Sequence, residues 1–111
     1  MRSASGPEFI QRADDPANAP VLAAMELLGQ RWVLRIVWEL EPGPLGFLEL
    51  RRRMGNCSSS MLAERLQQLS AANLTAKSET GAWELTVCGH ALGTALAPLW
   101  DWSESWKPRA K

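Results

Sequence analysis

The sequence feature that most restricts the possible folds of this chain is a short glycine-containing turn, residues 55–57, because it separates two amphipathic segments. Apolar residues recur at helical spacing over 47–54 before the turn and over 59–72 after it. Ser58 stands directly before the second segment, where a hydroxyl side chain caps a helix N-terminus. Two helices joined by such a turn form the helix-turn-helix pattern, which is predicted here over about 47–72.

A short β-like region follows the second helix. Residues 74–79 and 82–85 read as two strands, and the intervening Thr80-Gly81 is typical of a two-residue hairpin turn. The sequence therefore predicts a hairpin over about 74–85. A hairpin after a helix-turn-helix is the order of a winged helix, in which it forms the wing.

The wing is followed by one more long helix. Thr86 can cap a helix over about 87–106, which would be about 30 Å long. The expected fold class is α+β, mostly α: a winged helix-turn-helix with dimerisation helices at both ends. We expect a flexible N-terminal arm over 1–17, the winged helix domain over 18–106 and a tail over 107–111.

Two helices are expected before the helix-turn-helix. Pro20 occupies the favoured first turn of a helix capped by Asn18 or Ala19, and Gly29 ends that helix. A second helix is predicted from about Arg31 to Leu40, before a Pro-Gly-Pro segment that stops it.

Composition excludes several classes of protein. The 111 residues carry 12 basic and 12 acidic side chains, so bulk positive charge does not bind nucleic acid here. Residues 31–81 are nonetheless net +2, with seven basic and five acidic residues. No stretch approaches the ~18 apolar residues of a membrane span, and no secretory signal is evident. We expect a cytoplasmic, nucleoid-associated protein without a membrane partner.

Reactive side chains are few. Cys57, Cys88 and the lone His90 cannot fill a closed four-ligand zinc site, so no metal or cofactor is expected. No phosphate loop or catalytic triad pattern occurs, and we expect no enzyme activity. Cys57 is read either as a redox-active thiol at a helix N-terminus or as an inert one. Cys88 is predicted to be buried.

The candidate DNA-contacting residues gather in and around the second helix of the helix-turn-helix. On a helical wheel Gln67 and Gln68 point outward, and a glutamine amide suits adenine in the major groove. Arg65 lies on the flank of the buried stripe, where it either holds the helix pair together or reaches a phosphate. The full set is Ser58, Ser59, Ser60, Gln67, Gln68, Arg52, Arg53, Arg65 and Lys77. The alternative is that the arginine run and the glutamines form an ordinary solvated surface.

The aromatic content is unusual, with six Trp and no Tyr. Trp32, Trp38 and Trp83 are predicted core residues. Three others crowd the end of the last helix, and large exposed aromatic patches mark interfaces. The predicted homodimer interface comprises Leu92, Leu96, Leu99, Trp100, Trp102, Trp106 and Val21. An alternative use of the same residues is a cleft that binds a small aromatic effector.

Three segments together resemble a known family. Glu26–Trp32, Ser58–Leu69 and Leu85–Gly89 are similar to the HxlR-type winged helix-turn-helix transcriptional regulators of the MarR-like superfamily. The resemblance spans about 19–106 without rearrangement. It implies a small dimeric regulator whose partners are double-stranded DNA and a second copy of the chain.

The chain also departs from the usual pattern of that family. Ala19 stands where the family usually has a cysteine that several members use to sense oxidants. Ser59 and Ser60 replace a common Pro and basic residue, and the wing offers only Lys77.

Two functions are therefore weighed. The first is a dimeric sequence-specific DNA-binding transcriptional regulator, with a recognition helix over about 58–72 in the major groove. The second is a winged-helix protein specialised for protein–protein or small aromatic ligand binding, with weak or no DNA contact.

Overall fold

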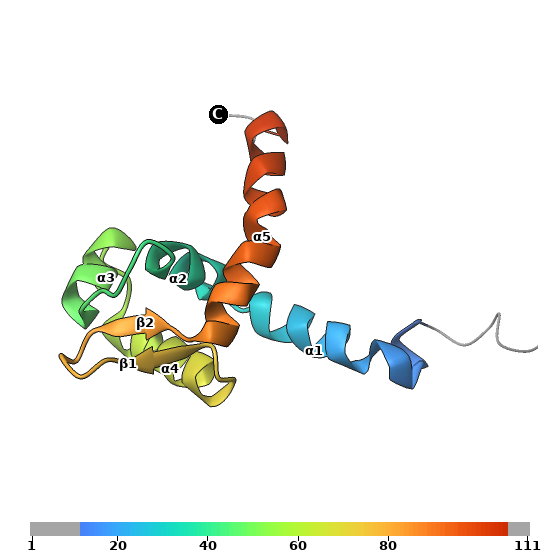
Figure 1. The fold of residues 1–111 in the computed structure, drawn as a ribbon, viewed down its shortest axis with the longest axis horizontal. Helices are drawn as coiled ribbons and strands as arrows, with labels where there is room; N and C mark the ends of the chain where they lie inside the picture. Colours follow the sequence, from blue (N-terminus) through green and yellow to red (C-terminus); the bar gives the residue numbers. More distant parts are fainter. Residues whose placement is uncertain (1–11, 107–111) are drawn as a thin grey trace, which may run out of the picture. The chain divides into compact units, whose positions relative to one another are not determined.

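The computed structural model describes residues 12–106, which form two compact units that divide between Arg31 and Trp32. Each unit is described by itself. The helices and strands (Figure 1) are η2 (Arg12–Asp14), η3 (Pro16–Asn18), α1 (Ala19–Leu28), α2 (Val33–Leu40), α3 (Phe47–Arg53), α4 (Ser59–Ala71), β1 (Thr75–Lys77), β2 (Trp83–Leu85) and α5 (Val87–Trp106).

The first unit consists of two 3-10 turns and α1. The carboxylate of Asp15 caps η3, and the side-chain amide of Asn18 donates to the carbonyl of Arg12 at 2.6 Å. The sequence did not predict these turns within the expected arm. Pro20 in the first turn of α1 and Gly29 at its C-cap stand where they were predicted. Residues 1–11 of the arm and the tail over 107–111 lie outside the described residues.

The second unit has a closed apolar core between α2, α3, α4 and the wing. Its apolar residues are Val33, Ile36, Val37, Leu40, Leu50, Met54, Leu62, Leu66, Leu69, Leu74, Trp83 and Leu85. The predicted inner face of α4, built from leucines at helical spacing, is fully buried. The winged helix-turn-helix and its fold class are confirmed.

Helix α2 begins two residues later than predicted, because Trp32 has a φ of +80°, in the left-handed region. Of the three tryptophans predicted in the core, Trp83 is buried and Trp32 is half-buried. The prediction is wrong for Trp38, which is 49% exposed. It lies outside the buried stripe of α2, with the guanidinium of Arg35 6.0 Å from its ring centroid.

The wing is an antiparallel pair in which Lys77 lies opposite Trp83. The backbone N–H of Ser78 donates to the carbonyl of Ala82 at 2.7 Å, which leaves a three-residue loop with Gly81 at φ +90°. The predicted two-residue turn is therefore wrong. Three-residue hairpin loops place a glycine in this left-handed conformation.

The wing is also fixed to the loop before α3. Leu45 and Trp83 exchange both backbone hydrogen bonds, at 2.9 and 2.7 Å. Trp83 thus pairs with Leu45 as well as with β1, at the end of the strands nearest the loop, and this pairing anchors the wing on the segment before α3.

Helix α5 has the predicted bounds, and the predicted cap is present. The Thr86 hydroxyl accepts from the backbone N–H of Gly89 at 3.0 Å. Gly89 is buried and lies so close to the neighbouring backbone that a Cβ there would overlap the carbonyl oxygen of Leu74. One turn later, Gly93 lies against the carboxylate of Glu41. The first half of α5 therefore packs closely on the rest of the unit.

Candidate nucleic-acid interface

The start of α4 presents three exposed serines. The Ser58 hydroxyl accepts from the backbone N–H of Met61 at 3.2 Å and lies 3.0 Å from the hydroxyl of Ser60. This confirms Ser58 as the N-cap, so part of its hydrogen-bonding capacity serves the helix itself. Ser59 and Ser60 lie in the exposed first turn, where a helix N-terminus favours an anion.

The two glutamines predicted on the outward face of α4 differ in exposure and in hydrogen bonding. Gln67 is exposed, whereas Gln68 is half-buried and its Oε1 accepts from Nη1 of Arg65 at 3.2 Å. Arg65 also lies 3.8 Å from the carboxylate of Glu64 and is only 16% exposed. Arg65 therefore ties side chains of α4 to one another.

The turn before α4 has a defined backbone. Gly55 and Asn56 have φ values of +75° and +58°, both left-handed. The Nε of Arg51 donates to the carbonyl of Cys57 at 2.5 Å and joins α3 to the far end of the turn. Arg51 is half-buried and stabilises the turn, so it is not simply part of a solvated arginine run.

The other two arginines of α3 share one carboxylate. Glu49 accepts from Nε and Nη2 of Arg52 at 3.0 and 2.5 Å, and from Nε of Arg53 at 2.8 Å. These hydrogen bonds, first that from Arg52 and then that from Arg53, lower the pKa of Glu49 from 4.5 to about 2. Glu49 entered the sequence-based predictions only as one of the five acidic residues of 31–81. Its spacing of three and four residues from the arginines is the signal that identifies the cluster.

Arg35 is a second residue whose role was not predicted from the sequence. Its Nε donates to the buried carboxylate of Glu39 at 2.7 Å, and its Nη2 donates to the backbone carbonyl of Arg53 at 2.6 Å. Arg35 thereby fixes the end of α3 to α2. Here too the four-residue spacing between Arg35 and Glu39 was visible in the sequence.

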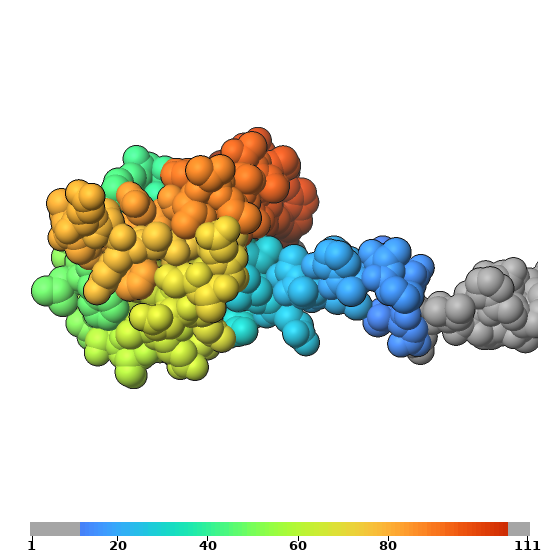
Figure 2. Space-filling view, turned by 60° about the horizontal axis from the view of Figure 1, so that its bottom comes forward, coloured from blue at the N-terminus to red at the C-terminus, as the bar shows by residue number. Residues whose placement is uncertain are grey.

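Lys77 is the basic residue of the wing. Its side chain is exposed at the end of β1, with the ammonium 5.5 Å from the ring centroid of Trp83. Figure 2 shows the wing and α4 side by side on one face of the larger unit, with α3 next to α4. The predicted DNA-contacting residues thus come from adjoining elements of one unit.

The predicted dimer residues on α5 form two groups. Leu92, Leu96 and Trp100 are half-buried, whereas Leu99, Trp102 and Trp106 are exposed. Trp102 and Trp106 stack on each other with centroids 5.1 Å apart and planes inclined by 13°. This aromatic surface is uncovered in the described chain.

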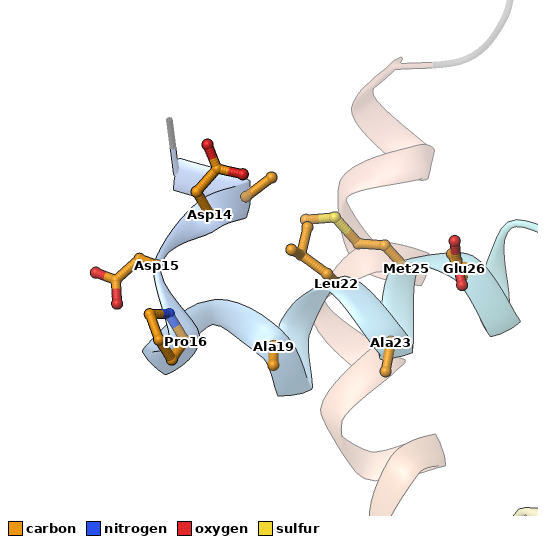
Figure 3. Close-up of a pocket in the computed structure, with 9 residues that line it drawn as sticks. Asp14, Asp15, Pro16, Ala19, Leu22, Ala23, Met25 and Glu26 are labelled. Atoms are coloured by element: carbon orange, nitrogen blue, oxygen red, sulfur yellow. The ribbon is translucent and has the colours of Figure 1, made fainter. Parts of the chain in front are cut away.

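Helix α1 carries the remaining predicted dimer residue, Val21, which is exposed together with Met25. Beside them is an open hollow of about 680 Å³ between α1 and the two preceding turns (Figure 3). Its wall includes Leu22 and Met25, with Asp14 and Asp15 at the turns and Glu26 toward the far end of α1. The hollow is apolar with an acidic rim.

The cysteines and acidic groups offer little for metal binding. Over residues 12–106, His, Cys, Asp and Glu form no group of three that could hold an ion. Cys57 is half-buried, and Cys88 is exposed, contrary to the prediction. The neighbouring Gly89 takes the inward position at the start of α5. In the same part of the chain, no helix is both long and apolar enough to span a membrane.

The helix pair α3 and α4, joined by a short turn and followed by a two-stranded wing, places the chain in the class of winged helix-turn-helix proteins. The HxlR-like helix-turn-helix family matches residues 27–111. The chain belongs to this family of transcriptional regulators, which implies DNA binding and is not a family of enzymes.

Relatives and solved structures agree with this assignment. The HTH-type transcriptional regulator YvaP of Bacillus subtilis is 32% identical over 89 residues, 75% of this chain and 82% of YvaP. The regulator Rv3095 of Mycobacterium tuberculosis is 32% identical over 92 residues, and the matched region spans 58% of its length. Quinone-bound YodB from B. subtilis matches with a TM-score of 0.72 at 30% identity, covering 78% of this chain and 97% of YodB.

Proposed function

We propose that the chain is a dimeric, sequence-specific DNA-binding regulator that places α4 in the major groove and acts on the nucleoid. The observation that carries the proposal is the outward face of α4. It presents an exposed Gln67 and a serine-rich N-terminus, next to the arginines of α3 and the lysine of the wing. The matched family binds DNA, and this face has the donors that such binding needs.

The geometry supports a division of roles along this face. Gln67 is the base reader, because its amide can both accept from N6 and donate to N7 of adenine. Gln68 is a weaker candidate, since its carbonyl oxygen already accepts from Arg65. Ser59, Ser60, Arg52, Arg53 and Lys77 contact phosphates, which position the protein without reading sequence.

A second copy of the chain completes the regulator. The apolar surfaces of α1 and α5 carry Val21, Met25, Trp102 and Trp106, all exposed in the single chain. Burying such surfaces between two copies removes apolar area from water. The resulting two-fold symmetry presents two α4 helices to half-sites about one helical turn apart.

The test is binding to the DNA upstream of its own gene at two salt concentrations. We expect Gln67→Ala to cost about 1–3 kcal/mol and to relax sequence preference at one position of each half-site. Gln68→Ala, which removes a paired amide, is the matched control and should cost less. Absence of a protected site at low salt would refute the proposal.

A small aromatic effector is a second candidate activity, favoured by the stacked Trp102–Trp106 pair. One related structure, YodB, is quinone-bound. Titration with a quinone should quench tryptophan fluorescence in a chain carrying Cys57→Ser and Cys88→Ser, which excludes addition to thiols. Trp102→Leu should remove part of that response, and an unchanged response would place the ligand elsewhere.

A further inference from the structure

The Glu49 carboxylate holds both arginines that the proposed function assigns to DNA phosphates. Its two oxygens accept three hydrogen bonds, two from Arg52 and one from Arg53. The Nε and Nη2 groups of Arg52 form the guanidinium edge that binds a carboxylate or a phosphate in the same bidentate way. In the free protein that edge is occupied.

The cluster lies where a phosphate can reach it. The side chains of Arg52, Arg53 and Glu49 are 66%, 44% and 37% exposed. Ion pairs this exposed are weak and exchange readily with other partners. The Arg53 backbone, in contrast, is held by Arg35 through the carbonyl at 2.6 Å. The helix is therefore fixed while the arginine side chains are able to change partner.

The charge of Glu49 opposes DNA binding. The carboxylate cancels one of the two positive charges of the pair, and its pKa of about 2 keeps it ionised at neutral pH. A phosphate that approaches either arginine meets a negative charge within hydrogen-bonding distance of the same guanidinium groups.

We propose that Glu49 competes with DNA phosphates for Arg52 and Arg53, and so lowers backbone affinity relative to base-specific affinity. The inference rests on the proposed DNA-binding function. When DNA binds, a phosphate displaces Glu49 from at least one arginine. The carboxylate thereby sets how strongly the protein holds any DNA, whereas Gln67 sets which DNA it prefers.

The experiment compares Glu49→Gln with Glu104→Gln, which removes the same charge from α5. Affinity for a random-sequence duplex is measured between about 50 and 200 mM salt, with thermal unfolding and native mass as checks of fold and assembly. We expect Glu49→Gln to bind roughly three- to tenfold more tightly at low salt. Its log K against log salt slope should steepen by about 2 for a dimer with one released arginine per subunit. Glu104→Gln should change neither quantity.

Equal affinity and slope in the two variants would overturn the inference, as would weaker binding by Glu49→Gln, because Glu49 would then position the arginines for DNA. These outcomes are distinct from failure of the proposed function. In that case neither the unmodified protein nor Glu49→Gln would bind DNA at about 50 mM salt, and the inference would fall with it.

Discussion

Helices α1 and α2 are both rich in apolar side chains, but they are buried very differently. In α2, Val33, Ile36, Val37 and Leu40 are in the core and at most 1% exposed. In α1, none of the ten residues is buried. The two helices follow each other in sequence and are separated only by residues 29–32.

The difference lies in how polar residues are distributed. Helix α2 places Arg35 and Glu39 four residues apart, and they pair with each other along one side. Helix α1 has a single charged residue, Glu26. An apolar surface without cover in one chain is typical of an interface, and the C-terminal half of α5 has the same character. The molecule thus has a closed unit that carries the proposed DNA-reading face, and uncovered apolar surfaces that we propose a second copy covers.

The largest expected effect concerns the buried face of α2. Ile36→Ala in α2 removes a fully buried side chain, and we expect a loss of about 2–5 kcal/mol in the free energy of unfolding. Met25→Ala in α1, a side chain 62% exposed, should cost the monomer less than about 0.5 kcal/mol. Urea denaturation at low protein concentration measures both. Equal losses in the free energy of unfolding would contradict the difference in burial between the two helices.

The next test concerns the covered half of α5. In Gly89→Ala the new Cβ overlaps a backbone carbonyl, that of Leu74, which cannot move without disturbing the wing. We expect about 1–3 kcal/mol of destabilisation. In Gly93→Ala the overlap is with the end of the Glu41 side chain, which can rotate away, and alanine favours the helix. A thermal melt in which Gly93→Ala is the less stable variant would contradict this packing.

A smaller effect is expected at the uncovered end of α5. Trp106→Ala removes one partner of the stacked pair, and we expect the dimer dissociation constant to rise about tenfold or more. Trp38→Ala is the control, because that ring is similarly exposed on α2. Sedimentation equilibrium gives both constants. A Trp38→Ala variant that dissociates while Trp106→Ala does not would move the interface to α2.

The smallest effect is the pH response of the arginine cluster. Because the folded-state pKa of Glu49 is lowered from 4.5 to about 2, its stabilising contribution is complete above pH 4.5. It declines as the pH falls toward 2. An NMR titration of the Glu49 carboxyl should show this low pKa, and Arg52→Ala with Arg53→Ala should return it toward 4.5. An unchanged value in the double variant would refute the pairing.

Most of the fold could be predicted from the sequence, because the ends of the helices depend on local signals. Pro20, Gly29, Ser58 and Thr86 each mark a helix end through their own backbone or hydroxyl chemistry. The wing loop was mispredicted because the second residue of a Thr-Gly pair suits either a two-residue or a three-residue loop. Only the pairing of Ser78 with Ala82 decides between them.

Side-chain environments were harder to predict. The prediction that Trp38 and Cys88 are buried was wrong, because burial depends on which face of a helix meets the rest of the unit. In α2 that face is set by the core, and in α5 by the close approach of Gly89 to Leu74. The roles of Arg35 and Arg51 were likewise missed, since each donates to a backbone carbonyl in another segment. Glu49, in contrast, could have been recognised as the partner of Arg52 and Arg53 from its spacing of three and four residues alone.

In the proposed regulator, two copies of α4 read DNA together, and the uncovered surfaces of α1 and α5 hold the two chains to each other. Hydroxyl-radical footprinting on a duplex selected from a random pool tests it most directly. We expect two protected segments on one face of the duplex, centred about 10 base pairs apart, with Gln67→Ala weakening both. A single protected segment, or uniform protection unaffected by Gln67→Ala, would contradict it.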